Sequence, residues 1–123
     1  MPFLIEKLLV YQRALDFAGR IGTLVQAFPR GESTLGDQLH RAAVSIVANL
    51  AEGNGRYRPA DRINFFRISR GSVFECVPLV ELCRRRGLID AAMHEQLYAS
   101  LEEISRMLSG LLKAGSGRAE GRP

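Results

Sequence analysis

The stretch LHRAAVSIVANLAEGNGR, residues 39–56, decides the fold of this chain. Its large apolar residues recur at steps of four and three, as they do on one face of an α-helix. The residues on this face are Leu39, Ala43, Ile46 and Leu50. Upstream, Ser33 or Thr34 is suited to cap the helix, and Asn54-Gly55 is suited to end it in the left-handed conformation. The sequence therefore predicts a helix from about residue 33 to residue 55.

A polar stripe follows the same predicted helix, again at steps of three and four. It consists of Gln38, Arg41, Ser45, Asn49, Glu52 and Arg56. One interpretation is a hydrogen-bonded seam against a neighbouring helix, with Glu52 and Arg56 as an ion pair. Ser45 would then bond back to the carbonyl of Arg41. The other interpretation is a ligand or catalytic site, which would need a poised base or nucleophile beside it. A polar seam fixes the register of packed helices, and this favours the structural role.

Three further segments have helical periodicity, at about residues 8–28, 59–86 and 91–113. The stripe of the first is Leu8, Tyr11, Leu15, Ala18, Ile21, Val25 and Phe28. The inner face of the second is Phe66, Ser69, Val73, Cys76, Val80 and Cys83. The third has Met93, Leu97, Leu101, Ile104, Leu108 and Leu111 on one face. Gly87 should end the second of these helices, and Asp90 should cap the third.

The connections between these helices are short, so consecutive helices should be antiparallel neighbours. The sequence predicts an all-α fold, an antiparallel up-down-up-down four-helix bundle over residues 1–114. Pro78 lies inside the predicted helix 59–86, where a kink or a split into two helices is expected. Residues 115–123 have no apolar side chain larger than alanine, and we expect a disordered tail there.

The apolar faces are wider than a monomeric bundle requires. A bundle helix needs about three apolar positions in seven, but segment 8–28 has 13 in 21 and segment 35–51 has 10 in 17. The surplus of apolar residues implies that each of these helices has a second buried face. This face lies either in an unusually thick core or against another subunit. We expect the subunit contact, and hence a homo-oligomer. No stretch is long and apolar enough to span a membrane, so the sequence predicts a soluble, cytoplasmic protein without membrane association.

Residues suited to catalysis or metal binding are scarce. His40 neighbours the polar stripe but has no acidic partner at helical spacing on both sides, and His94 stands next to Glu95 on a solvated face. Both are interpreted as surface histidines. Cys76 and Cys83 are seven residues apart, which is a same-face helical spacing and not a metal or disulfide pattern. No HExxH, CxxC, GxxxxGK[ST] or GxGxxG motif occurs. The sequence therefore predicts a protein that is not an enzyme, with no metal, no cofactor and no apparent small-molecule substrate.

Charge is segregated along a chain of 123 residues with a formal net charge of +4. The basic residues of interest fall in segment 56–70 and in a later triplet. They are Arg56, Arg58, Arg62, Arg67 and Arg70, followed by Arg84, Arg85 and Arg86. Arginines beside Tyr57 suit phosphate contacts with base stacking, which points to RNA or DNA. Alternatively, they form a solvated basic face that pairs with the net-negative segment 87–112.

The segments 39–56 and FFRISRGSVFE, residues 65–75, closely resemble the proteins called 23S rRNA intervening-sequence proteins. The resemblance extends over about residues 7–90. It places the family motif on Arg41, Ser45, Asn49, Glu52, Gly53, Gly55, Arg56, Gly71, Ser72 and Glu75. It also suggests that Gly71, which is unfavourable inside a helix, allows a close approach of two helices. Arg58, Arg62 and Pro78 depart from the family pattern.

The resemblance implies a small bacterial protein of unsettled role that assembles as a homopentamer. The fold is shared with retroelement accessory proteins that are basic pentamers and bind nucleic acid. Two functions are therefore expected from the sequence. The first is nucleic-acid binding, with RNA favoured, through the arginine-rich surface. The alternative is a homo-oligomeric scaffold that organises protein partners without binding nucleic acid.

Overall fold

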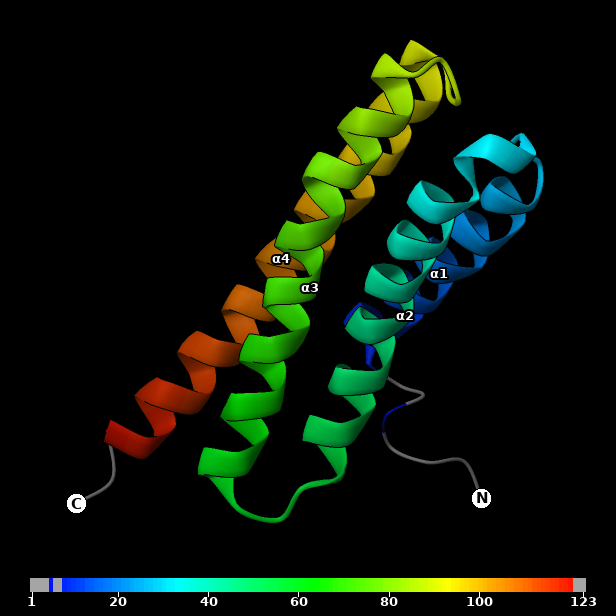
Figure 1. Cartoon of the computed structure of the whole chain (residues 1–123). Coiled ribbons are helices and arrows are strands. Elements are labelled where there is room, and N and C mark those ends of the chain that lie inside the picture. The colour runs from blue at the N-terminus through cyan, green and yellow to red at the C-terminus, as the bar shows by residue number, and fades with distance from the viewer. Residues whose placement is uncertain (1–4, 6–7, 121–123) are drawn as a thin grey trace.

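The computed structural model describes residue 5 and residues 8–120, with side chains described up to residue 114, and these residues form an all-helical protein (Figure 1). The helices are α1 (Leu9–Gln26), α2 (Ser33–Gly55), α3 (Pro59–Arg85) and α4 (Ala91–Glu120). A 3-10 turn, η2 (Arg30–Glu32), precedes α2. Each helix packs against two others, in the cyclic order α1, α2, α3, α4. The chain reverses direction at each connection in Figure 1, with α1 and α2 on one side of the molecule and α3 and α4 on the other.

The core is built from one apolar face of each helix. All residues of the predicted inner faces of α2 and α3 are buried. On the predicted inner face of α4, the buried residues are Leu97, Leu101, Ile104 and Leu108. Two serines lie among these apolar residues: Ser69 is completely buried, and Ser72 is 7% exposed. The all-α fold of four helices predicted from periodicity is therefore confirmed for the described residues.

The predicted inner face of α1 is correct only in part. Its buried residues are Val10, Ala14, Phe17 and Ile21. Of the predicted stripe, Ile21 is buried, whereas Leu15 is 43% exposed. The partly buried members that pack against the core are Leu8, Ala18, Val25 and Phe28. Because α1 carries two apolar stripes at helical spacing, periodicity alone does not say which of them meets the core. Packing against α2 and α4 decides it.

The helix ends differ from the predictions in two places. Ser33 and Thr34 do not cap α2, because η2 leads directly into the helix and the N-cap position falls on Glu32. Gly55 is not left-handed, and the chain leaves α2 through an extended Arg56. At the other end of α3, Gly87 has a φ of 72° and is left-handed, as predicted. Asp90 caps α4, since its Oδ1 accepts a hydrogen bond of 2.8 Å from the Met93 backbone N–H.

Pro78 does not split α3, which is continuous from Pro59 to Arg85. Both Pro78 and Phe74, whose carbonyl loses its helical donor, lie on the exposed side of α3. Water can therefore satisfy that carbonyl, while the opposite side of α3 stays packed against the core. Helix α4 continues to Glu120, into the segment where we expected a disordered tail. Residues 121–123 of that predicted tail lie outside the described residues.

Candidate functional site

The polar stripe of α2 meets α3 through a chain of side-chain hydrogen bonds. The Ser45 and Ser72 hydroxyls lie 2.7 Å apart, across the two helices. The Asn49 amide donates to the Ser45 hydroxyl at 3.1 Å and to the Ser45 carbonyl at 2.9 Å. The Ser72 hydroxyl can donate to the Ile68 carbonyl at 3.3 Å, in which case Ser45 donates to Ser72. Ser45 therefore bonds across to α3, and the expected bond to the Arg41 carbonyl is not formed.

A second contact between α2 and α3 is fully buried. The Ser69 hydroxyl donates to the Ile46 carbonyl at 2.7 Å. The sequence analysis predicted that Ser69 lies on the inner face of α3, but it did not predict a hydrogen bond for its hydroxyl. A lone hydroxyl on an otherwise apolar face was the available signal, because a buried hydroxyl requires a partner.

The outer side chains of the stripe and motif form no hydrogen bond or ion pair to α3 among the described residues. Glu52 and Arg56 form the expected ion pair within α2, on the exposed side. Arg41 and Glu75 are also exposed and make no hydrogen bond or ion pair within the described residues. Midway along the two helices, the side-chain hydrogen bonds between α2 and α3 are therefore made by the serines, with Asn49 supporting Ser45.

The close approach of α2 and α3 is at Gly53, not at Gly71. A Cβ atom at Gly53 would lie 2.8 Å from the Phe66 ring and 3.1 Å from the Arg62 carbonyl oxygen. A Cβ atom at Gly71 would meet nothing within 4 Å, and the same holds at Gly55. The expectation that Gly71 allows close packing is therefore wrong within the subunit, since Gly71 lies on the exposed side of α3.

The turn between α2 and α3 gathers arginines around an exposed aromatic ring. Tyr57 is 98% exposed. Arg58 beside it is exposed and makes no ion pair or side-chain hydrogen bond among the described residues. The Arg56 guanidinium, besides its bond to Glu52, lies over the Phe65 ring at 4.7 Å from the ring centre. Arg67 follows on the exposed surface of α3, also without an ionic partner in the described part of the chain.

Arg62 has a structural task in this turn. Its Nη1 donates to the carbonyls of Asn54 at 3.1 Å and Arg56 at 3.4 Å, which ties the first turn of α3 to the end of α2. Its guanidinium lies 5.9 Å from the centre of the Phe66 ring. Arg70 is half-buried and lies over Phe74, with a buried Nε that has no partner in the described residues.

The structure does not bring all eight candidate arginines together. Arg84, Arg85 and Arg86 lie at the opposite end of α3, about 39 Å from Arg58 at 1.5 Å per residue. Arg85 pairs with Glu81 at 2.8 Å and Arg86 pairs with Glu32 at 2.6 Å. The described ion pairs of these two arginines therefore involve α3 and the end of η2, and not the acidic α4.

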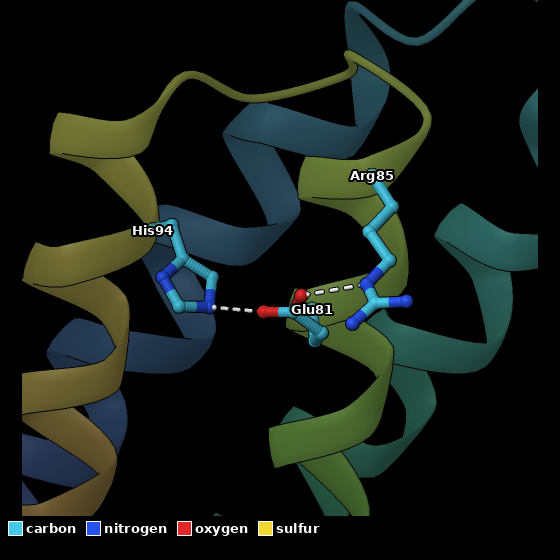
Figure 2. A network of polar contacts seen from close by, with 3 residues as sticks. All are labelled: Glu81, Arg85 and His94. Carbon is cyan, nitrogen blue, oxygen red and sulfur yellow. Dashed lines mark hydrogen bonds and ion pairs between the residues drawn. The ribbon is translucent and has the colours of Figure 1, made fainter.

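A polar network links α3 to α4 near that end, as Figure 2 shows. Glu81 on α3 accepts from Arg85 Nε, and His94 Nε2 on α4 lies 3.0 Å from Glu81 Oε1. The Arg85 hydrogen bond, together with the charges of Arg85, His94 and Arg84, lowers the pKa of the Glu81 carboxyl despite partial burial. The interpretation of His94 as a residue on a solvated face is wrong, because its side chain is 25% exposed and joins the two helices.

The two cysteines, Cys76 and Cys83, are buried. Burial, with the neighbouring Glu75 carboxylate, raises the pKa of the Cys76 thiol to about 12, and burial also raises the pKa of Cys83. Both cysteines are therefore neutral thiols at physiological pH and poor nucleophiles. No group of three His, Cys, Asp or Glu side chains that could hold a metal ion occurs among the described residues. Within the same residues, each helix is too short or too polar to cross a membrane.

Comparison with known proteins places this bundle in a family. A crystal structure of a Bacteroides thetaiotaomicron protein of the S23 ribosomal protein family, of unknown function, is similar, with a TM-score of 0.81 and 28% sequence identity. The match covers 85% of this chain and 99% of that one. No curated protein matches the chain. The family model for the 23S rRNA-intervening sequence protein matches residues 6–110, and the chain therefore belongs to that family.

Proposed function

We propose that the chain is a non-enzymatic, cytoplasmic subunit of a homo-oligomer of antiparallel four-helix bundles that binds RNA through the α2–α3 turn. The observation that carries the proposal is the pairing of an almost fully exposed aromatic ring, Tyr57, with an unpaired neighbouring arginine, Arg58. Exposed aromatic rings stack on bases, and arginine guanidinium groups bind phosphate, so together they suit a single strand.

The electrostatics of this turn support the choice of an anionic partner. Arg58 and Arg67 have no intramolecular ionic partner in the described residues, so phosphate would not have to displace a carboxylate from either of them. Arg56 keeps guanidinium donors free beyond the one bonded to Glu52. By contrast, Arg85 and Arg86 at the far end of α3 are already paired. The RNA surface proposed here is therefore narrower than the eight arginines expected from the sequence.

The family name supports RNA as the class of nucleic acid, because it refers to intervening sequences of 23S rRNA. Assembly into a homo-oligomer would multiply the number of phosphate contacts that the arginines of one subunit can make. If five subunits, the number implied by the family resemblance, each contribute two phosphate contacts, the logarithm of the binding constant should fall with the logarithm of salt at a slope of about −7 for a single strand. Such a slope is readily measured.

The test is RNA and DNA binding across a salt series from about 50 to 300 mM, for the wild type and for the double variant Arg58→Gln/Arg67→Gln. We expect the variant to lose most of its affinity at low salt and to show a much shallower slope. Tyr57→Ala should weaken binding by about 1 to 3 kcal/mol, as expected for the loss of one base stack, without changing the slope.

A matched control is Arg20→Gln/Arg30→Gln, which removes the same charge from exposed arginines distant from the α2–α3 turn in sequence. This control should bind almost as well as the wild type. Binding that is absent at 50 mM salt, or that responds equally to both double variants, would contradict the proposal. The scaffold function, in which the oligomer only organises protein partners, would then be the better account.

A further inference from the structure

A small hollow opens between α3 and α4, which pack side by side in the bundle (Figure 1). Its volume is about 230 Å³, below the roughly 300–1,000 Å³ of pockets for drug-sized ligands. The buried Val73 and Leu101 belong to its lining, and so do the half-exposed rings of Phe74 and Tyr98. A hollow of this size with aromatic rings in its lining suits one flat, aromatic ring system.

Two opposite charges line the α3–α4 hollow without neutralising each other. Glu102 and Arg106 are exposed and lie four residues apart on α4, in the order that favours an ion pair. Neither side chain makes a hydrogen bond or an ion pair within the described residues. The same spacing does give an ion pair at Glu81 and Arg85 on α3. The hollow therefore offers an unused carboxylate acceptor and an unused guanidinium donor beside an apolar surface.

This combination of groups matches the edges of guanine. A carboxylate accepts two parallel hydrogen bonds, and among the RNA bases guanine alone has two adjacent N–H donors, N1–H and N2–H₂. A guanidinium donates to O6 and N7 of guanine, which is the commonest specific contact of arginine with a base. Adenine and cytosine carry a ring-nitrogen acceptor beside their amino group, and the N–H of uracil lies between two carbonyls. With any of these bases, one oxygen of Glu102 would face another acceptor.

Cations continue along α3 from the α2–α3 turn to the hollow. Phe74 follows Arg58 by 16 residues, or about 24 Å at 1.5 Å per residue. Arg67 lies two helical turns before Phe74, on the same side of α3. The Arg70 guanidinium lies 4.7 Å from the centre of the Phe74 ring and has no ionic partner within the described residues. A stacked strand covers the distance with about seven nucleotides, at about 3.4 Å per phosphate.

We infer that the α3–α4 hollow, lined by Phe74, Tyr98, Glu102 and Arg106, binds one unpaired guanine of the RNA strand held at the α2–α3 turn. The inference rests on the proposed RNA binding and adds a base-specific contact to it. The aromatic side chains contact the face of the base, while Glu102 and Arg106 bind its edges. Phosphate contacts at the turn position the strand, and the hollow selects the base.

The test compares the binding of two single strands of about 12 nucleotides, one entirely uridine and one with a single guanine in its middle. The wild type should bind the guanine strand about 10-fold more tightly, as expected for one bidentate contact with a base. Glu102→Gln should reduce this preference to within about twofold, because its amide offers one acceptor oxygen in place of two. Its affinity for the uridine strand should not fall, since the substitution removes a negative charge.

Modified bases assign the two edges of guanine to the two side chains. Inosine lacks the 2-amino group, so the wild type should bind an inosine strand several-fold more weakly than the guanine strand, whereas Glu102→Gln should bind both alike. 7-Deazaguanine lacks the N7 acceptor, and its strand should lose affinity for the wild type but not for Arg106→Gln. A modified base that weakens the wild type and its matching variant equally would contradict that contact.

A matched control is Glu95→Gln, which removes the same charge from the exposed surface of α4, two helical turns from Glu102 and outside the lining of the hollow. It should keep the preference for guanine. Guanosine monophosphate should bind at least about 10-fold more weakly than the guanine strand, because it makes no contact at the turn.

The possible outcomes separate this inference from the proposed function. If the wild type binds neither strand, RNA binding itself is wrong, and the guanine site with it. If the wild type binds both strands equally, or if the preference survives in Glu102→Gln, RNA binding stands and the guanine site is wrong. If guanosine monophosphate binds as tightly as the guanine strand, the ligand is a free nucleotide and the assignment to an RNA strand is wrong.

Discussion

At the scale of single residues, the structure distinguishes between glycines that look equivalent in the sequence. Gly53 and Gly55 both belong to the family motif and both lie at the end of α2. Gly53 is buried with the Phe66 ring against it, whereas Gly55 is exposed with open space around its Cα. The motif therefore combines one glycine required by packing and one that packing within the subunit does not require.

Gly53→Ala should destabilise the subunit by about 1 to 3 kcal/mol, as expected for overpacking of a well-filled contact. The added methyl group would lie 2.8 Å from a ring atom of Phe66 and 3.1 Å from the Arg62 carbonyl, so α2 and α3 would have to separate. The matched control is Gly55→Ala, which should be neutral or stabilising by up to about 1 kcal/mol, because alanine favours the helix. Denaturant unfolding of the two variants measures the difference. Equal stability would contradict the close approach at Gly53.

At the scale of elements, α2 and α3 are held together by apolar packing and by side-chain hydrogen bonds, of which the contact of Ser69 with Ile46 is fully buried. The ion pair at the exposed end of the polar stripe joins residues of the same helix, so it adds to α2 alone. We therefore expect the contribution of a polar residue to the stability of the α2–α3 contact to depend on its burial and not on its place in the stripe.

Ser69→Ala should cost about 1 kcal/mol, the usual net value of a hydrogen bond, because it removes the 2.7 Å contact to the Ile46 carbonyl. Glu52→Ala should cost less than about 0.5 kcal/mol, because exposed ion pairs within a helix contribute little. The thermal unfolding of both variants, at the same oligomer concentration, gives the comparison. A larger loss for Glu52→Ala would mean that this carboxylate has an important partner in the assembled protein.

At the scale of the whole molecule, the unpaired arginines of the proposed RNA surface and the exposed apolar side chains of the α3–α4 hollow lie on different parts of the subunit. Arg58 lies at the α2–α3 turn and Arg67 follows on α3, while the hollow lined by Val77, Tyr98 and Leu101 lies between α3 and α4. A strand bound at both places would therefore run along α3 past Arg67.

Removal of residues 115–123 should leave the melting temperature of the subunit nearly unchanged. Among the described side chains, the last core residues of α4 are the buried Leu108 and the half-buried Leu111 and Leu112, all upstream of this segment. Substitutions away from core contacts usually change stability by less than about 0.5 kcal/mol, and we expect the same for this deletion. A large drop in the melting temperature, or a change in the mass of the oligomer, would show that the segment packs against a neighbouring subunit.

The amino-acid sequence by itself determined the four helices and the inner faces of α2, α3 and α4. Each of these helices has a dominant apolar stripe, so the period of the sequence also identifies the side that is buried. Local chemistry was equally decisive at Gly87, where the chain needs a positive φ, and at Asp90, whose carboxylate satisfies a free N–H group of α4. Such features depend on residues that are close together in the chain, so they can be predicted directly from the sequence.

Only the tertiary structure decided which neighbours meet. Leu15 and Ala14 are both on helical stripes of α1, and the packed neighbours of that helix determine that Ala14 is buried. Arg62 and Arg58 look alike in the sequence, but the fold brings the Asn54 and Arg56 carbonyls to Arg62 and leaves Arg58 without a partner among the described residues. The physical reason is that periodicity says which side chains share a face, whereas the contacts of that face come from residues distant in the chain.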